Sequence, residues 1–240
     1  MNTATNILPM GQLLAFPTRE IKPTRTNSSL KSNGQPKATP ADPIKEEVKL
    51  RELQQYFQTQ GNLRNELLFT LGLSFAIRGG DLLGLTLGHV YCSDGTPKDN
   101  FKLYEDKTNK RNTIDINSKC QDLLNQYYQE RKDNFNLTDP LFISRERNPD
   151  GTVRPLSLRQ LNRILGAAAK AVGIDSHISS HSLRKTFGYQ AMKQSNYSQD
   201  TLYALQYIFN HSDIRVTYIY TGLEQDKAKG VREMVGSLLD

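Results

Sequence analysis

The chain has 240 residues, a formal net charge of +6 at pH 7 and a pI near 9.2, so it can bury a sizeable core and its charge favours a polyanionic partner such as DNA. No apolar run reaches the roughly 18 residues of a membrane span, and no basic leader precedes the short apolar stretch near the N-terminus, so we expect neither a membrane span nor a signal peptide. Cys92 and Cys120 stand far apart, which excludes a CxxC metal pair and fits a reducing, cytoplasmic location.

Residues 1–41 differ in composition from the rest of the chain. They are rich in Pro, Ser, Thr, Asn, Gly and Lys, and such a segment cannot bury enough apolar surface to offset the entropy lost on ordering. We therefore expect a flexible basic tail, followed by one folded domain over residues 42–240. The pair Asp42-Pro43 has the form of a helix start, an N-cap acid followed by proline, and predicts a first helix that runs to Gln60.

A second helix is predicted in the segment NLRNELLFTLGLSFAIR, because leucine and phenylalanine recur at helical spacing from Leu63 to Phe75. After this segment the pattern changes. The short segments HVYCS, FKLYE and NTIDI are separated by the turn signals DGTPKDN and KTNKR. They predict three short strands.

From residue 118 onward the pattern returns to helices. Ser157 supplies an N-cap and Gly173 a stop for one of them. The predicted ranges are 118–134, 158–172, 180–194, 199–209, 213–220 and 223–238. The predicted fold class is therefore α+β, a mostly helical domain with a small antiparallel sheet.

The segment HISSHSLRKTF contains two polar pairs that could carry chemistry. His181 and Arg184 stand three residues apart and so share one face of a helix. An isolated pair of this kind is more often a solvated polar face than a site. His177 and His181 have the spacing of a helical zinc pair, but the sequence offers no third ligand, so we expect no metal site.

Two further segments contain candidate site residues. In AIRGGDLLGL, Arg78 precedes Asp81 by three residues, which by itself indicates a local ion pair worth roughly 0.2–0.5 kcal/mol. The two glycines between them allow a backbone or a ligand to approach closely. In HSDIRVTYIYTG, His211 precedes two tyrosines, Tyr218 and Tyr220, which are either packing aromatics or include a nucleophile.

The order of these segments is more specific than any one of them. RGGDLLGLT comes first, then a predicted β-hairpin with a lysine at its turn, then HSLRKT, and last HSDIRVTYIYTG. This ordered set resembles the catalytic domain of the tyrosine recombinases, also called the phage integrase family, over residues 45–235. The resemblance implies that fold and an enzyme that cuts and rejoins DNA through a covalent 3′-phosphotyrosine, with no cofactor, metal ion or ATP.

The resemblance also implies which residues act. Asp81 would support the first arginine, and Lys110 is an alternative to Lys107 as the hairpin lysine. Tyr218 would be a packing or DNA-facing neighbour of the nucleophile. The implied catalytic set is Arg78, Lys107, His181, Arg184, His211 and Tyr220.

Three more basic residues are candidate DNA contacts. Arg159 and Arg163 stand on neighbouring turns of a predicted helix, and for both an interpretation as solvated surface charge stays open. At Lys185 the chain departs from the commonest family pattern, since many members have a second histidine there.

The chemistry requires these residue types. A phosphodiester attacked by an oxygen nucleophile develops negative charge on its non-bridging oxygens, which two planar arginine forks match. A phenol with an ordinary pKa near 10 needs a base or a cationic field to lose its proton. His181 can take that proton or bind the phosphate, and His211 can orient the phosphate. Lys107 can protonate the leaving 5′ oxygen.

Two rival functions and the assembly state complete these expectations. A type IB topoisomerase-like relaxer would share the chemistry without ordered strand exchange, and a non-catalytic DNA-binding accessory protein would not need all six residues. Family members usually carry an N-terminal helical domain that closes a clamp around DNA, and here we expect none. The apolar residues at helical spacing within residues 223–240 need a groove, which either the same domain or a neighbouring protomer could supply. Because this segment often docks on a neighbouring protomer in the family, we predict a monomer in solution and a tetramer on paired double-stranded DNA sites.

Overall fold

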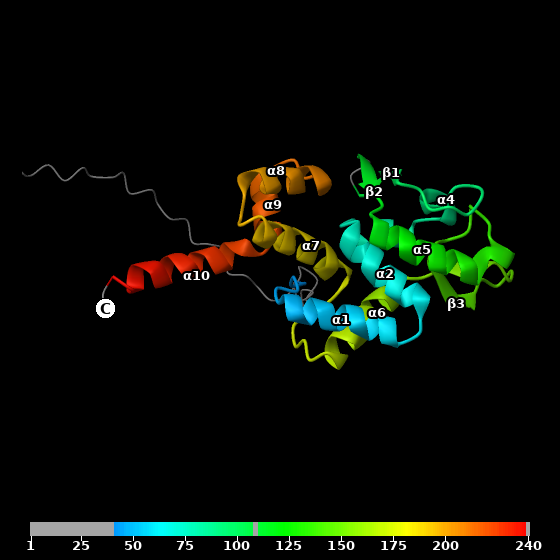
Figure 1. Cartoon of the computed structure of the whole chain (residues 1–240), viewed down its shortest axis with the longest axis horizontal. Coiled ribbons are helices and arrows are strands. Elements are labelled where there is room, and N and C mark those ends of the chain that lie inside the picture. The colour runs from blue at the N-terminus through cyan, green and yellow to red at the C-terminus, as the bar shows by residue number, and fades with distance from the viewer. Residues whose placement is uncertain (1–40, 108–109, 239–240) are drawn as a thin grey trace, which may run out of the picture. The chain divides into compact units, whose positions relative to one another are not determined.

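The structure, a computed structural model, describes residues 41–107 and 110–238. The predicted tail therefore lies almost wholly outside the described residues. Helices dominate the described part, and two short hairpins accompany them (Figure 1). The predicted fold class is confirmed, with two small antiparallel sheets where the sequence predicted one.

The elements follow the chain in a simple order. The first half holds α1 Glu47–Thr59, α2 Leu63–Ser74, α3 Gly79–Leu83, α4 Leu87–Val90, β1 Asn100–Tyr104, β2 Arg111–Asp115 and α5 Ser118–Arg131, which continues as the short 3₁₀ turn η1 Lys132–Asn134. The second half holds β3 Ile143–Arg147, β4 Val153–Pro155, α6 Leu158–Ala171, α7 Ser180–Gln194, α8 Gln199–Ile208, α9 Ile214–Tyr220 and α10 Leu223–Gly236.

The first helix begins later than the sequence predicts. Residues 42–46 are not helical, and α1 starts at Glu47. Ile44 is buried, its backbone N–H donates to Thr186 Oγ1 at 2.8 Å, and its carbonyl accepts a hydrogen bond from Gln190 Nε2 at 3.0 Å. These contacts with α7 satisfy the backbone groups that a helix would otherwise pair. The predicted earlier start is therefore wrong.

The segment HVYCS is not a strand. It overlaps the end of α4, whose start is closed by a capping box in which Thr86 and His89 bond each other's backbone. Tyr91 forms only an isolated bridge with Pro97. The local cap outweighs the strand propensity of Val90 and Tyr91, and the predicted strand is wrong.

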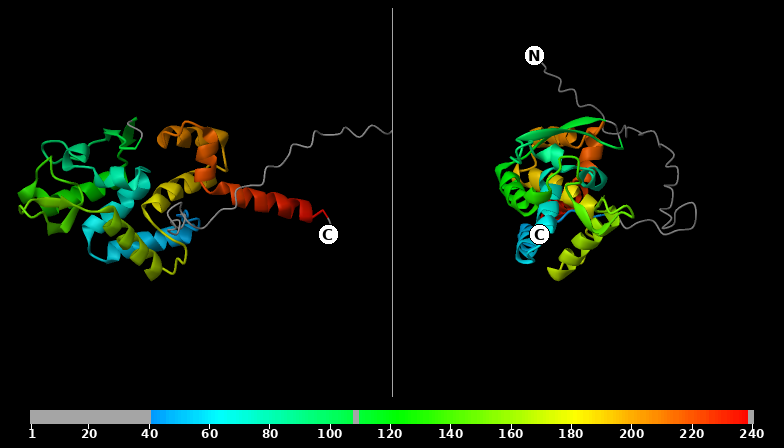
Figure 2. Two further views of the ribbon diagram at one scale, coloured as in Figure 1. Left: turned by 180° about the vertical axis from the view of Figure 1, so that it is seen from behind. Right: turned by 90° about the vertical axis from the view of Figure 1, so that its right-hand side faces the viewer.

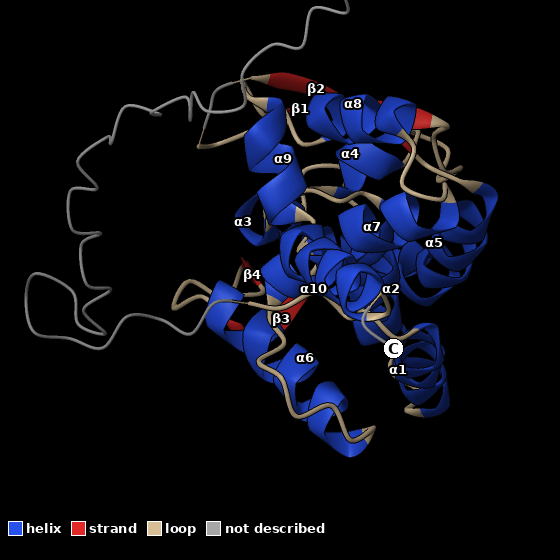
Figure 3. Cartoon of the chain, turned by 90° about the vertical axis from the view of Figure 1, so that its left-hand side faces the viewer, coloured by secondary structure: helices blue, strands red, loops and turns tan. Residues whose placement is uncertain are grey.

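The other two predicted strands form the hairpin β1–β2. They pair antiparallel from Asn100 opposite Asp115 to Tyr104 opposite Arg111, and each alternates exposed and buried residues. A second hairpin, β3–β4, was not predicted. Figure 3 shows the strands of the two hairpins at separate places among the helices.

Two apolar clusters hold the described residues together. The larger one draws on α1, α2, α5, α6 and the first hairpin. The smaller one contains Ala76 and buried residues of α7, α8 and the start of α10, with Tyr218 and Tyr220 packed against it. Within this cluster α7 contacts α8, and α9 contacts both α8 and α10. α9 lies between α8 and the start of α10 (Figure 2). The smaller cluster therefore supports the face of α9 that carries Tyr220.

Candidate active site

A buried arginine on α7 joins two bends of the chain. Arg184 is only 2% exposed, and its Nη1 donates to the carbonyl of Ala76 at 2.8 Å while its Nη2 donates to the carbonyl of Phe209 at 2.9 Å. Ala76 lies two residues before Arg78, and Phe209 lies two residues before His211. The Arg184 guanidinium thus fixes the two bends of the backbone that carry Arg78 and His211.

Arg78 stands at the N-cap of α3 and makes two acidic contacts. Its Nη1 donates to the carboxylate of Glu105 and lies 3.9 Å from Asp81 Oδ2. The other carboxylate oxygen of Asp81 accepts the backbone N–H of Asp106 at 3.0 Å, and burial raises the pKa of Asp81. The Asp81 side chain therefore links α3 to the turn between β1 and β2, close to Arg78.

Gly79 allows α3 to approach α7 closely. A Cβ atom there would lie 2.5 Å from Ser180 Oγ and 2.9 Å from Leu158 Cδ1. The close approach expected from the two glycines is found at Gly79. The groups that approach it are the side chains of Ser180 and Leu158 rather than a ligand.

The two hairpin lysines occupy different surroundings. Lys107 lines a pocket of about 250 Å³ together with Arg78, Asp81 and His181. The ammonium of Lys110 donates to the carbonyl of Asn210 at 3.2 Å. Lys107 thus faces the site pocket, whereas Lys110 secures the hairpin to the end of α8.

His211 follows α8 and bonds to α9. Its Nδ1 lies 3.0 Å from Thr217 Oγ1. Burial, and then the positive charges of Arg184 and Arg78, lower the pKa of His211 to about 4. The imidazole is therefore neutral at pH 7 and serves as a hydrogen-bonding group.

Tyr220 is the last residue of α9, and its hydroxyl oxygen lies 3.4 Å from His181 Nδ1. Its ring centroid lies 5.4 Å from that of His211. Burial raises the pKa of the phenol, against the opposing effect of Arg184 and Arg78. Burial also lowers the pKa of His181, helped by Arg184 and Lys185. A protonated phenol therefore faces a neutral imidazole that can accept its proton.

The remaining predicted residues lie around this centre. Tyr218 is half-buried and packs on the smaller cluster, and on a helix its side chain diverges from that of Tyr220. The ammonium of Lys185 lies 5.6 Å from the Tyr220 ring centroid. Arg159 and Arg163 are both exposed on α6. Within the predicted catalytic set, His181 and His211 contact Tyr220, and the Arg184 guanidinium lies over the Tyr220 ring. Arg78 and Lys107 line one pocket with His181.

One buried acid at this centre was not predicted from the sequence. Glu105 has no exposed surface and contacts both Arg78 and Asn210. A signal was present, since the two-residue period of β1 buries Phe101 and Leu103 and places Glu105 on the same face.

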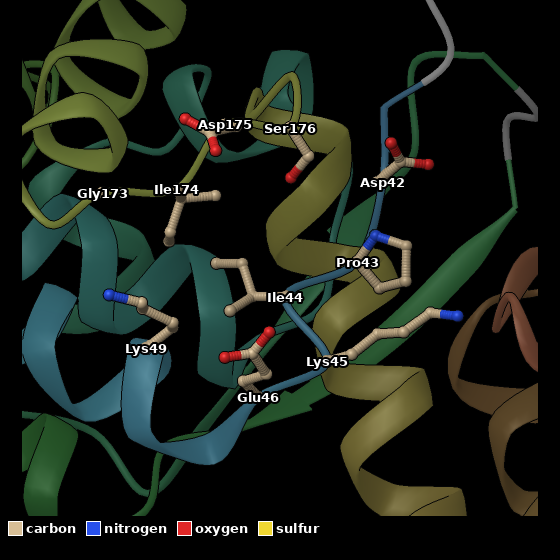
Figure 4. A pocket seen from close by; sticks show the side chains of 10 residues that line it. All are labelled: Asp42, Pro43, Ile44, Lys45, Glu46, Lys49, Gly173, Ile174, Asp175 and Ser176. Carbon is tan, nitrogen blue, oxygen red and sulfur yellow. The ribbon is translucent and has the colours of Figure 1, made fainter.

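A second pocket lies away from this centre. It encloses about 490 Å³ between residues 42–46, Lys49 and residues 173–176 (Figure 4). None of the predicted site residues lines it. Its size alone gives no chemistry, and the convergent polar groups lie at Tyr220.

The described ranges, 41–107 and 110–238, also bear on two other kinds of site. No three or more His, Cys, Asp or Glu side chains there are grouped so as to hold a metal ion. Within the same ranges, no helix combines the length and apolar character that a membrane crossing needs.

Comparison with known proteins places this chain among DNA-recombining enzymes. The model of the phage integrase family matches residues 45–227. The chain is 32% identical over 196 residues to the protein named Probable integrase/recombinase YoeC of Bacillus subtilis strain 168, a match that covers 82% of this chain and 97% of that protein. It is 28% identical to Tyrosine recombinase XerD of Halalkalibacterium halodurans over 71% of this chain but 53% of that protein, so it spans about half the length of XerD.

Solved structures agree on the fold. The chain is similar to the XerA recombinase with a TM-score of 0.60 at 20% identity, covering 86% of this chain and 67% of that one. It is similar to the XerH site-specific recombinase, bound to its palindromic difH substrate after cleavage, with a TM-score of 0.61 at 16% identity, covering 82% of this chain and 54% of that one. The chain belongs to the phage integrase family, the tyrosine recombinases, which catalyse the cleavage and rejoining of DNA.

Proposed function

We propose that this chain is a site-specific recombinase that cuts double-stranded DNA with Tyr220 and rejoins it by reversing the same step. The observation that carries the proposal is the 3.4 Å separation of the Tyr220 hydroxyl oxygen and His181 Nδ1, with the Arg184 guanidinium carbon 5.9 Å from the centroid of the Tyr220 ring. Residues 42–240 form the catalytic domain in this proposal, and residues 1–41 a basic tail that assists DNA binding. Such an enzyme acts on DNA in the cytoplasm.

Cleavage follows from the roles of the side chains. The Tyr220 oxygen attacks the scissile phosphorus while His181 accepts the phenol proton. The bond between phosphorus and the 5′ oxygen breaks, and Lys107 protonates that oxygen. Charge on the non-bridging oxygens is stabilised by Arg78 and Arg184, and His211 donates a hydrogen bond to one of them.

The hairpin lysine in this scheme is Lys107. It shares a pocket with Arg78 and His181, where a leaving oxygen on the bound phosphate could reach its ammonium. Lys110 is already bonded to the Asn210 carbonyl and so is better suited to holding the hairpin. Energy of the broken phosphodiester is kept in the 3′-phosphotyrosine, so rejoining needs no ATP, and no step in the scheme uses a metal ion.

DNA contacts and assembly extend the same proposal. The similar solved structures include complexes with DNA, among them a XerH recombinase on difH and a transposon integrase on transposon end DNA. We assign Arg159, Arg163 and Lys185 to contacts with DNA phosphates. We also assign a tetramer on paired sites, because α10 and the residues that follow it expose apolar side chains that need a partner surface, Val231, Met234, Val235 and Leu238.

A nicked substrate that loses a short strand after cleavage tests the proposal. The wild type should accumulate a covalent DNA adduct that survives EDTA, and Tyr220→Phe should form none while keeping its DNA affinity. Tyr218→Phe is the matched control, since it removes the neighbouring hydroxyl and should leave the adduct intact. Loss of the adduct in the control would move the nucleophile to Tyr218.

The rival functions give different products in the same assay. A relaxer would remove supercoils without forming recombinant junctions between two sites. An accessory DNA-binding protein would shift the DNA in a gel and form no adduct. Recombinant junctions that depend on Tyr220 would exclude both.

A further inference from the structure

Glu105 is a charged side chain that the proposed cleavage scheme does not use. It ends the exposed-and-buried alternation of β1 and has no exposed surface. One carboxylate oxygen accepts a hydrogen bond from Arg78 Nη1, and the other accepts one from Asn210 Nδ2 at 3.2 Å. A fully buried carboxylate is costly unless it is paired and hydrogen-bonded, and these two donors meet that requirement.

The two partners of Glu105 come from segments that also carry other site residues. Arg78 opens α3, and Asn210 directly precedes His211. The backbone N–H of Glu105 donates to the carbonyl of Lys110 at 3.0 Å, which closes the hairpin turn that carries Lys107. The Glu105 carboxylate therefore lies where the segments that carry Arg78, His211 and Lys107 meet.

The same two segments are joined a second time by Arg184. Arg184 bonds the carbonyls of Ala76 and Phe209, whereas Glu105 bonds the side chains of Arg78 and Asn210. The first bridge fixes the backbone of the two bends. The second fixes a functional side chain, because Arg78 has several rotatable bonds beyond its backbone.

We propose that Glu105 is a positioning residue for cleavage, which holds the Arg78 guanidinium in the orientation that receives the scissile phosphate. This inference rests on the proposed function. The Arg78 side chain keeps 21% of its surface exposed while it is paired, so part of its fork stays open to a ligand. An arginine ordered before DNA arrives loses little rotamer freedom when the phosphate binds.

The negative charge of Glu105 has a second consequence in the same place. Arg78 and Lys107 line one pocket, Arg184 lies close enough to Arg78 for their charges to interact, and Lys110 is bonded to Asn210, a partner of Glu105. A buried carboxylate among them reduces their mutual repulsion while the phosphate is absent. Asp81 also lies beside Arg78, and one of its oxygens accepts the backbone N–H of Asp106.

A double-mutant cycle on the full chain tests this role. The four proteins are the wild type, Glu105→Gln, Arg78→Ala and the double variant, each measured for single-turnover cleavage at saturating DNA, for DNA affinity and for thermal unfolding. Glu105→Gln should lower the cleavage rate by about tenfold or more with an affinity within roughly twofold of wild type, since small misplacements of a catalytic group slow chemistry strongly. In the Arg78→Ala background the same change should cost less than about twofold, because the residue through which Glu105 acts is already absent.

The matched control is Asp115→Asn, which removes an exposed acid from the other end of the same hairpin and should cleave like the wild type. Equal losses from Glu105→Gln in both backgrounds, or a wild-type rate, would overturn the positioning role. Thermal unfolding shows whether a loss merely follows reduced folding, and the rate is then compared at a temperature where every variant is folded. Absence of a Tyr220 adduct in the wild type is a separate result, which overturns the proposed function itself.

Discussion

The Nδ1 atom of His181 lies 3.4 Å from the hydroxyl oxygen of Tyr220, across the gap between α7 and α9. The pKa values of the two groups are shifted in opposite directions, because burial raises the pKa of the phenol and lowers that of the imidazole. The pair therefore stands as an acid facing an uncharged base. The distance is long for a hydrogen bond, as is common in an active site without its substrate.

The first prediction concerns this pair. His181→Gln should slow single-turnover cleavage by roughly 10²–10⁴-fold, the usual contribution of a general base. Because the pKa of His181 is lowered from 6.5, the wild-type rate should hold near neutral pH and fall only as the pH drops below that value. A pH–rate profile checks this. An acid limb that persists unchanged in His181→Gln would assign the base to another group.

The second prediction separates the two arginines. Arg184→Lys should lower the free energy of unfolding by roughly 2–4 kcal/mol, because one ammonium cannot bond the carbonyls of both Ala76 and Phe209. Arg78→Lys should cost much less stability. Both should lose about 10²–10³-fold in cleavage rate. Urea unfolding and single-turnover cleavage, measured on both variants, test this prediction. Equal losses of stability in Arg184→Lys and Arg78→Lys would contradict the bridging role of Arg184.

The third prediction is a pH dependence of stability. The pKa of His211 is about 4 in the folded chain and near 6.5 when unfolded, so between these values the unfolded chain binds a proton that the folded chain lacks. The free energy of unfolding therefore falls as the pH drops from 6.5 towards 4.

In His211→Gln this contribution is absent. When the pH is lowered from 7 to 5, the free energy of unfolding of the wild type should therefore fall by on the order of 1 kcal/mol more than that of the variant. This figure is reduced to allow for the partial exposure of the His211 ring. His89 and His181 titrate with the same sign in both proteins and cancel in the difference. Parallel stability curves for the two proteins would refute the assignment.

The fourth prediction concerns α10. Leu223 is buried, whereas Met234 and Leu238 are 70% and 81% exposed. Deleting residues 224–240 should therefore leave the fold and single-site DNA binding intact but abolish the tetramer on paired sites and recombination. Sedimentation of the complexes measures this. A truncated protein that still assembles and recombines would exclude docking of α10 on a neighbour.

Local signals in the sequence predicted much of the fold. The helix after Ser157 begins at the expected cap, where Ser157 forms a capping box with Gln160, and ends before Gly173, which has a φ of 67°. Such caps are decided by residues near one another in sequence. The predicted helix start at Asp42 failed because the backbone of Ile44 is hydrogen-bonded to α7, more than 140 residues away, which no local pattern encodes.

The candidate site was predicted through the order of its motifs, and its geometry was not. The spacing of His181 and Arg184 places them on one helix, but only the fold brings His181 to Tyr220 and Arg184 to the bends at Ala76 and Phe209. Glu105 was missed because glutamate near a predicted turn is usually solvated. Its burial depends on contacts with Arg78 and Asn210, distant in sequence.

The most direct test of the central claim is to identify the atom that carries the DNA. The wild-type protein is trapped on a nicked substrate, digested with protease, and the DNA-linked peptide is sequenced by mass spectrometry. We expect a phosphotyrosine at Tyr220, joined to the 3′ end of the cut strand with a free 5′ hydroxyl on the other side. Linkage through another residue, linkage to a 5′ end, or a cut strand with no attached peptide would contradict it.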